Sequence, residues 1–162
     1  MTTVYFFHGS MSSPQSTKIQ AMKPIAEVLG YSVDIPDHSD IRNPDERVSA
    51  ILKRNDLAID DFYLVGSSMG GYVATVLSET LKPKGLFLLA PAFYMDGYAI
   101  QNPIPHAEKT TIIHGWQDDV VPLSNVFKFA QTHHASLHIL DDTHNLRASI
   151  PQINDIFRHF LS

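Results

Sequence analysis

The sequence contains no cysteine, which excludes disulfide bonds and thiolate chemistry. Its 12 Lys and Arg residues are scattered and are outnumbered by 17 Asp and Glu, for a net charge of −5. Clustered basic residues are what nucleic acid and anionic membranes require, so we expect neither as a partner. No apolar run approaches the ~20 residues of a membrane helix, and no signal-peptide pattern opens the chain. We therefore predict a soluble, cytoplasmic protein.

A length of 162 residues predicts one domain, residues 1–162, with a sizeable core. Short apolar runs of strand character alternate with helical patterns along the whole chain. Such alternation predicts an α/β fold, a doubly wound, mostly or wholly parallel six-stranded sheet with helices on both faces. The predicted strands are Val4–Phe7, Tyr31–Pro36, Phe62–Val65, Gly85–Pro91, Thr110–Gly115 and Ser136–Leu140.

Three predicted helices have recognisable start signals. Ser13-Pro14 and Asn43-Pro44 each combine a capping residue with a proline suited to the first helical position, and Ser124 can cap a third helix. The last helix should bury the face that carries Ile150, Ile153, Ile156, Phe157 and Phe160.

The segment Gly66-Ser67-Ser68-Met69-Gly70 joins a predicted buried strand to a predicted buried helix. A strand, a G-x-S-x-G turn and a helix form the context of a nucleophile elbow, in which the central serine projects from the top of the sheet. The glycines would let the strand and the helix approach closely. A phosphate-binding loop would need a different glycine pattern, which the chain lacks. Ser68 is therefore the candidate nucleophile.

Two further polar residues, Asp118 and His144, also lie just past the ends of predicted strands. Functional residues of parallel sheets gather at the carboxyl ends of the strands, so these residues can share one site with Ser68. A serine hydroxyl needs an imidazole to take its proton, and the imidazole needs a carboxylate to fix its tautomer. His144 is our candidate base and Asp118 the candidate orienting group, with its neighbour Asp119 as the alternative.

At this point the chain resembles the α/β-hydrolase superfamily, and in particular its small, lidless, esterase-like members. The resemblance rests on four motifs in order, and Ser, Asp and His follow one another as they do in that superfamily. The motifs are His8-Gly9, Gly66 to Gly70, His114-Gly115-x-x-Asp118-x-x-Val121-Pro122, and His144. The resemblance implies that the backbone N–H groups of Met69 and Ser10 form the oxyanion hole. It also leads us to expect hydrogen-bonded, supporting roles for His8 and His114.

A long segment with little periodicity, residues 92–109, follows the fourth predicted strand. Its apolar side chains can line a substrate pocket, together with Trp116, or they can be core and loop packing. The pocket candidates are Phe93, Tyr94, Met95, Tyr98 and Trp116.

Neither a metal nor another cofactor is expected. Asp141, Asp142 and His144 could in principle bind a metal, but they lack a recognised ligand spacing.

These residues lead us to expect a serine hydrolase that cleaves small carboxylic esters, or thioesters, through an acyl-Ser68 intermediate. The same three residue types serve amidases and peptidases, which is the first alternative. The second is a binding protein that keeps the fold without the chemistry. The partner expected is a small-molecule ester, and the sequence carries no signal for a particular oligomeric state.

Overall fold

The computed structural model describes residues 2–58 and 60–162, which build one six-stranded sheet with the strand order β2-β1-β3-β4-β5-β6. Every pair of neighbouring strands is parallel. The strands are β1 (Thr3–Phe7), β2 (Ser32–Asp34), β3 (Phe62–Ser67), β4 (Gly85–Leu89), β5 (Lys109–Gly115) and β6 (Ser136–Leu140). The predicted fold class, an α/β fold with a mostly or wholly parallel six-stranded sheet, is confirmed, and the sheet is wholly parallel.

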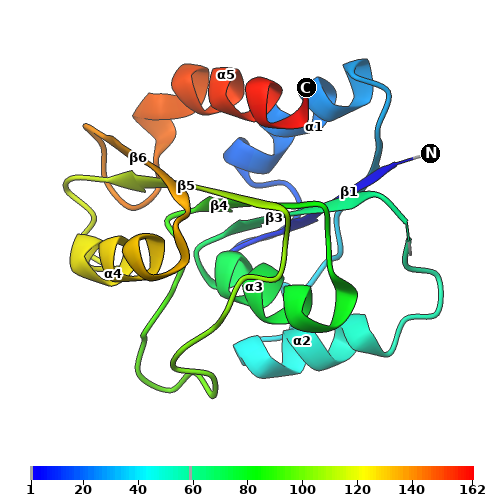
Figure 1. Ribbon diagram of the computed structural model, residues 1–162, viewed down its shortest axis with the longest axis horizontal. Coiled ribbons are helices and arrows are strands. Elements are labelled where there is room, and N and C mark those ends of the chain that lie inside the picture. Colours follow the sequence, from blue (N-terminus) through cyan, green and yellow to red (C-terminus); the bar gives the residue numbers. More distant parts are fainter. Residues whose placement is uncertain (1, 59) are drawn as a thin grey trace.

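Helices cover both faces of the sheet (Figure 1). One face is covered by α1 (Thr17–Val28) and α5 (Ile150–Leu161), and the other by α2 (Pro44–Leu52), α3 (Met69–Leu81) and α4 (Leu123–His133). A short 3₁₀ helix, η1 (Arg147–Ser149), leads into α5.

Two of the predicted helix starts are wrong and one is confirmed. The first helix begins after Ser16, whose hydroxyl accepts a hydrogen bond from the Ile19 N–H, whereas Ser13 closes a turn by accepting one from the Ser16 N–H. Helix α4 begins at Leu123 with Pro122 as its N-cap, two residues before the expected cap Ser124. Asn43 caps α2 as expected, because its side chain accepts hydrogen bonds from the N–H groups of Asp45 and Glu46.

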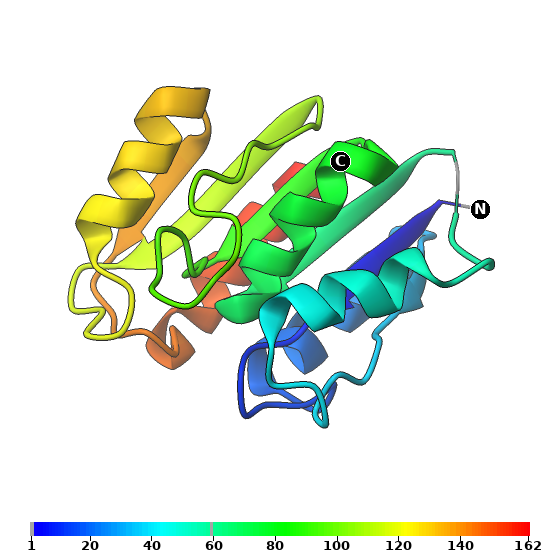
Figure 2. The same ribbon diagram turned by 90° about the horizontal axis from the view of Figure 1, so that it is seen from below.

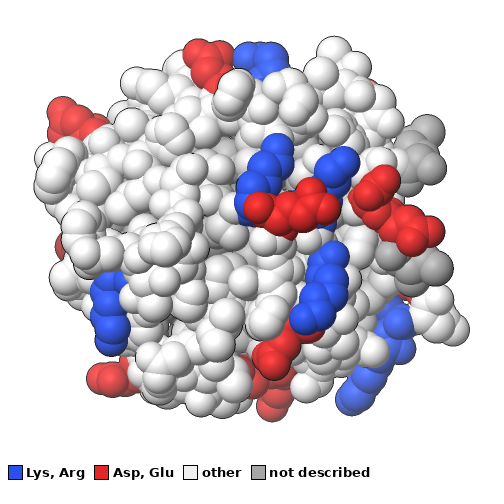
Figure 3. All heavy atoms as spheres, in the orientation of Figure 1, with Lys and Arg blue, Asp and Glu red and all other residues white. Residues whose placement is uncertain are grey.

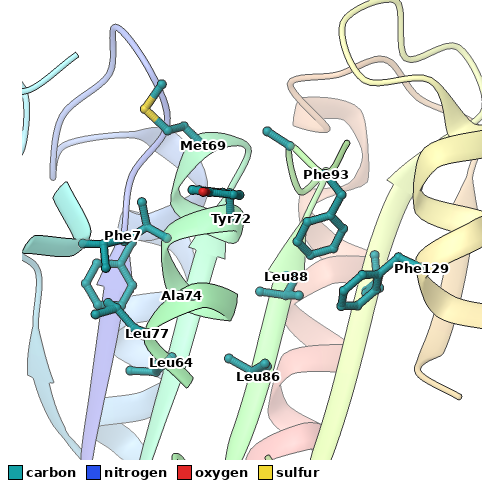
Figure 4. Close-up of a cluster of buried hydrophobic side chains, with 14 of the residues drawn as sticks. Phe7, Leu64, Met69, Tyr72, Ala74, Leu77, Leu86, Leu88, Phe93 and Phe129 are labelled. Atoms are coloured by element: carbon teal, nitrogen blue, oxygen red, sulfur yellow. The ribbon is translucent and has the colours of Figure 1, made fainter. Parts of the chain in front are cut away.

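The alternating side chains of the strands divide the core into two clusters. Val4 and Phe6 of β1 pack towards α1 and α5, while Tyr5 and Phe7 pack towards α2 and α3. In the cluster that contains Tyr5 and Phe7, Phe93 stacks on Phe129 of α4 with ring centroids 4.0 Å apart (Figure 4). Each fully buried large apolar side chain contributes about 1.5–3 kcal/mol relative to an exposed one.

The loops that follow β1, β3, β4, β5 and β6 gather along one edge of the sheet, at the lower left in Figure 2. This edge holds the carboxyl ends of the strands, where parallel sheets carry their functional residues.

On the face shown in Figure 3, Lys and Arg side chains lie among Asp and Glu side chains and do not form an extended basic surface. Within the described part of the chain, no helix has both the length and the apolar character needed to cross a bilayer.

Candidate active site

Ser68 forms the turn between β3, which ends at Ser67, and α3, which begins at Met69. Its backbone has φ 53° and ψ −115°, a conformation that costs a non-glycine residue about 1–3 kcal/mol. Backbone hydrogen bonds hold it there. The Ser68 N–H donates to the Leu89 carbonyl at 2.8 Å, and the Ser68 carbonyl accepts from the N–H of Ala92 at 3.0 Å. The end of β4 therefore maintains the strained turn.

Two glycines let three segments of backbone meet at this turn. A Cβ at Gly66 would overlap the carbonyl of Gly70, and a Cβ at Gly70 would overlap the carbonyl of Phe7 at the end of β1. Helix α3 can therefore start directly against β1 and β3. The close approach expected from the glycine pattern is present.

The three candidate catalytic residues form a chain of hydrogen bonds. The Ser68 Oγ lies 3.0 Å from His144 Nε2, and His144 Nδ1 lies 2.7 Å from Asp118 Oδ2. Each residue comes from a different loop: the turn after β3, the loop after β5 and the loop after β6. Asp119 is exposed, so the carboxylate that reaches His144 is that of Asp118.

The side chain of Asp118 has no exposed surface. Burial by itself raises the pKa of its carboxyl group, but hydrogen bonds from His144 and from the N–H groups of Val121 and Val120 outweigh it and hold the pKa below its ordinary value. Both N–H groups lie 2.8 Å from Asp118 Oδ1. Asp118 is therefore a carboxylate at neutral pH, with Oδ2 aimed at the imidazole.

His114 contacts the same carboxylate from the end of β5. Its Nε2 lies 2.9 Å from the Val121 carbonyl oxygen and 3.3 Å from Asp118 Oδ2. Burial lowers the pKa of His114, so the ring is neutral and Nε2 carries the proton that these oxygens accept. This is the supporting contact expected for the histidine of this HG turn.

The loop after β1 passes beside Ser68, because a Cβ built on Gly9 would lie 3.5 Å from Ser68 Cβ. His8 anchors this loop: its Nε2 accepts a hydrogen bond from the His38 N–H at 2.9 Å, so Nδ1 carries the proton and donates to the Gly9 carbonyl. Burial lowers the pKa of His8 and keeps the ring neutral. Ser10 follows in this loop. Met69 is the first residue of α3, so its N–H has no acceptor within the helix.

Arg47 of α2 holds the loop after β1 through hydrogen bonds to its backbone carbonyls. Its side chain is 2% exposed, and its guanidinium donates to the carbonyl oxygens of Ile41 at 2.7 Å, His8 at 2.8 Å and Gly9 at 3.3 Å. The cation thus fixes two consecutive peptide groups just before Ser10. Sequence reasoning missed this residue, because a basic side chain beside Val48 in an amphipathic helix is ordinarily exposed.

The five pocket candidates do not line one common hollow. Phe93 is fully buried against Phe129 and belongs to the core, which contradicts its assignment to an open pocket. Trp116 is 61% exposed and lines a separate apolar hollow of about 480 Å³ with residues of α4 and β6.

The other three candidates are half-buried in the segment between β4 and β5. Tyr98 packs edge-on against Tyr72, and Lys128 of α4 lies over the ring of Tyr94. Met95 lies beside Asn125. Their role in binding stays a prediction.

A metal centre finds no support among residues 2–58 and 60–162, where no group of three or more His, Cys, Asp or Glu side chains could hold an ion. Asp142 instead accepts a hydrogen bond from the Ser149 hydroxyl at 2.8 Å, at the start of α5.

Residues 3–110 match the model of an uncharacterised protein family, UPF0227. The chain belongs to the UPF0227 family. The match includes Ser68 and the loop after β1, while Asp118 and His144 lie beyond it. The comparison with curated proteins finds no match.

Solved structures resemble this UPF0227 chain over almost its whole length. A protein of Xanthomonas campestris assigned by name to the hydrolases of the alpha/beta superfamily is 27% identical, with a TM-score of 0.89 over 98% of this chain and 97% of that one. Est1E from Butyrivibrio proteoclasticus, solved with bound ferulic acid, is 15% identical, with a TM-score of 0.80 over 99% and 88%.

A third structure, a Xanthomonas campestris α/β serine hydrolase without a lid, is 19% identical, with a TM-score of 0.69 over 96% of this chain and 79% of that one. The fold of this UPF0227 protein is that of the α/β-hydrolase superfamily, and the superfamily resemblance expected from the motifs is confirmed. In terms of enzyme class, the protein is a hydrolase.

Proposed function

We propose that this protein is a serine hydrolase that cleaves small carboxylic esters or thioesters through an acyl-Ser68 intermediate. The observation that carries the proposal is the unbroken hydrogen-bond chain from Ser68 Oγ through His144 to the buried Asp118 carboxylate. A hydroxyl activated in this way is a nucleophile at neutral pH, and its strained backbone fixes its direction.

In the first half of the reaction, Ser68 Oγ attacks the ester carbonyl carbon while His144 Nε2 takes the hydroxyl proton. Asp118 stabilises the resulting imidazolium. The oxyanion accepts hydrogen bonds from the N–H groups of Met69 and Ser10, an interaction in which each donor is worth about 10²–10³ in turnover. The tetrahedral intermediate collapses when its bond to the leaving alcohol or thiol breaks, and His144 Nε2 donates its proton to that leaving group.

In the second half, water takes the place of the alcohol. His144 Nε2 accepts a proton from the water as its oxygen attacks the acyl carbon, and the proton passes to Ser68 Oγ as the acid leaves. The enzyme returns to its starting state.

The elements of the chain support a small substrate. Between β4 and β5 lies a segment of irregular structure, residues 90–108, and within residues 2–58 and 60–162 no inserted lid domain stands above the sheet. The solved relatives described as binding ferulic acid and as lacking a lid support the same interpretation.

Reaction with a fluorophosphonate, followed by intact mass and peptide mapping, tests the proposal. We expect one adduct on Ser68 that is lost in Ser68→Ala. The matched control is Ser67→Ala at the last residue of β3, which should keep the adduct. A folded wild-type protein that gains no adduct would contradict the proposal and favour a binding protein on this fold. Matched ester and amide substrates then separate an esterase from an amidase, since preference for the amide would overturn the ester assignment.

A further inference from the structure

A polar hollow of about 480 Å³ lies between the loop that carries Ser10 and the loop that carries His144. It is lined by residues 11–13 and 15–18 on one side and by Asn145 and Arg147 on the other. Met11 directly follows Ser10, and Asn145 directly follows His144. The hollow therefore borders the oxyanion loop and the residue that follows the catalytic base.

The lining carries two positive side chains, Lys18 and Arg147, and no carboxylate. Lys18 Nζ donates a hydrogen bond to the Asn145 carbonyl at 2.9 Å, and among the described residues neither cation has a carboxylate within ion-pair distance. Burial first, and then the positive charge of Arg147, lowers the pKa of Lys18 to about 8. Two like charges thus face one cavity whose lining holds no carboxylate, although the whole chain has a net charge of −5. Asp142 and Asp118 are not part of the lining and partly offset the effect of Arg147 on the pKa of Lys18.

Serine hydroxyls at the edge of the hollow can donate as well. Ser13 Oγ accepts a hydrogen bond from the Gln15 N–H, and Ser16 Oγ accepts one from the Ile19 N–H. Each hydroxyl keeps its own hydrogen for donation to an acceptor in the cavity. Paired cations with neighbouring hydroxyl donors suit a carboxylate or a phosphate oxygen.

The side of the substrate that reaches the hollow follows from the proposed mechanism. His144 Nε2 must protonate the leaving oxygen or sulfur, so the leaving group has to lie against His144. The next residue along the chain, Asn145, already belongs to the hollow, and Lys18 holds its carbonyl. If the leaving group extends past His144 towards Asn145, the alcohol or thiol part of the substrate enters the hollow that carries the two cations.

We propose that this hollow is a subsite for an anionic group, a carboxylate or a phosphate, on the alcohol or thiol part of the substrate, bound by Lys18 and Arg147. The proposal rests on the serine-hydrolase function proposed above and names the substrate class of that site. The preferred substrates are then esters or thioesters of small acids with anionic alcohols or thiols.

The test compares kcat/KM for two butyrate esters, one of 3-hydroxybenzoate and one of its neutral methyl ester. The variants are Lys18→Met and Arg147→Gln, with Lys23→Met on the exposed side of α1 and Arg158→Gln on α5 as matched controls outside the hollow. We expect each subsite variant to lower the ratio of anionic to neutral kcat/KM about tenfold, as loss of a charged hydrogen bond would. Both controls should keep the wild-type ratio.

Two further substrates show on which side of the ester the anionic group must lie and whether it can be a phosphate. Monophenyl glutarate carries its carboxylate on the acyl side, and its kcat/KM should change less than twofold in the variants. A butyrate ester of 3-hydroxyphenyl phosphate should follow the carboxylated phenol if the subsite accepts phosphate.

The outcomes separate the two proposals. If the wild type hydrolyses the neutral ester and no variant changes the ratio, the subsite is overturned while the esterase stands. Lys18→Met can lose activity on both esters because Asn145 shifts. In that case the ratio of anionic to neutral kcat/KM in Arg147→Gln tests the subsite, and an unchanged ratio there would contradict it. A folded wild type that hydrolyses neither ester would contradict the proposed function, and therefore also the proposed subsite.

Discussion

Asp118 has its two carboxylate oxygens engaged in different tasks. The N–H groups of Val120 and Val121 fix Oδ1, and this leaves Oδ2 directed at His144 and His114. A buried carboxylate held in this way imposes one tautomer on the neutral imidazole, with the proton on Nδ1 and a free lone pair on Nε2 towards Ser68.

The variant Asp118→Asn should therefore keep the fold and lose turnover. Its amide oxygen would take the place of Oδ1, and its NH₂ would face His144 Nδ1 and force the proton onto Nε2. We expect kcat to fall roughly 10⁴-fold, measured on a neutral aryl ester. The exposed Asp119→Asn is the matched control and should stay within about twofold of wild type. Equal losses in the two variants would contradict the assignment of the orienting carboxylate.

The low pKa of Lys18 gives the proposed anion subsite a pH dependence. The groups that face this amine are Arg147, which favours its neutral form, and Asp142 and Asp118, which oppose that effect. Because the pKa lies at about 8, the amine is charged below that pH and neutral above it. The ratio of anionic to neutral kcat/KM should fall as pH rises, with a midpoint near 8, since kcat/KM reports the free enzyme. In Lys18→Met the ratio should be flat over the same range, and a flat wild-type profile would contradict the role of Lys18.

Among single residues, the sequence predicted those whose chemistry is tied to a motif. Ser68, His144 and Asp118 each follow a recognisable strand end, and the structure brings them together. Lys18 and Arg147 are far apart in the chain and belong to no motif, so their meeting depends on how two loops pack. Phe93 was misassigned because an aromatic residue in a long irregular segment can still turn into the core.

The element that links the helical layer to the oxyanion loop is α2. Through Arg47 it binds the carbonyls of His8 and Gly9, and through Asp45 it accepts a hydrogen bond from the Tyr72 hydroxyl of α3 at 2.6 Å. The loop after β1 is thereby tied to the helix that also contacts the nucleophile helix. The sequence predicted the start of α2 from Asn43 and Pro44, but its buried cation could be found only from the packing.

Replacement of Arg47 by lysine should impair turnover more than binding. An ammonium group keeps the charge but cannot reach three separate carbonyl groups, so the peptide that precedes Ser10 would shift. We expect kcat to fall about 10–100-fold with a smaller change in KM, because the displaced N–H acts mainly on the transition state. The exposed Arg42→Lys on the preceding loop is the control. A change confined to the thermal unfolding midpoint would show that Arg47 only stabilises the fold.

The whole molecule is held by two apolar clusters that share one sheet. Phe93 lies in the cluster under α3 and α4, and Phe157 lies in the cluster under α1 and α5. Strands β1, β3, β4 and β5 supply side chains to both clusters. The sequence predicted this two-sided burial from the alternation of apolar strands with helical patterns, whereas the strand order needed the three-dimensional structure.

Because the clusters share their strands, they should unfold together. Phe93→Ala and Phe157→Ala should each lower the free energy of unfolding by about 3–5 kcal/mol, through the cavity that each change leaves. Urea titrations followed by far-UV circular dichroism and by the fluorescence of Trp116 should give coincident single transitions in both variants. Phe127→Ala, at a position that is 53% exposed, is the control and should cost less than about 0.5 kcal/mol. Separate transitions for the two probes would contradict a shared core.

The strand order also has a consequence for biosynthesis. The turn that holds Ser68 and the loop that carries Ser10 precede β4 in the chain, whereas His144 follows β6, which is made after the other described strands and lies at one edge of the sheet. A chain still attached to the ribosome can place β4 beside β3 while Ser68 has no base to activate it. Under the proposed mechanism, Ser68 therefore has no base until His144 has been made, and chains that stop before His144 carry the serine in an inert form.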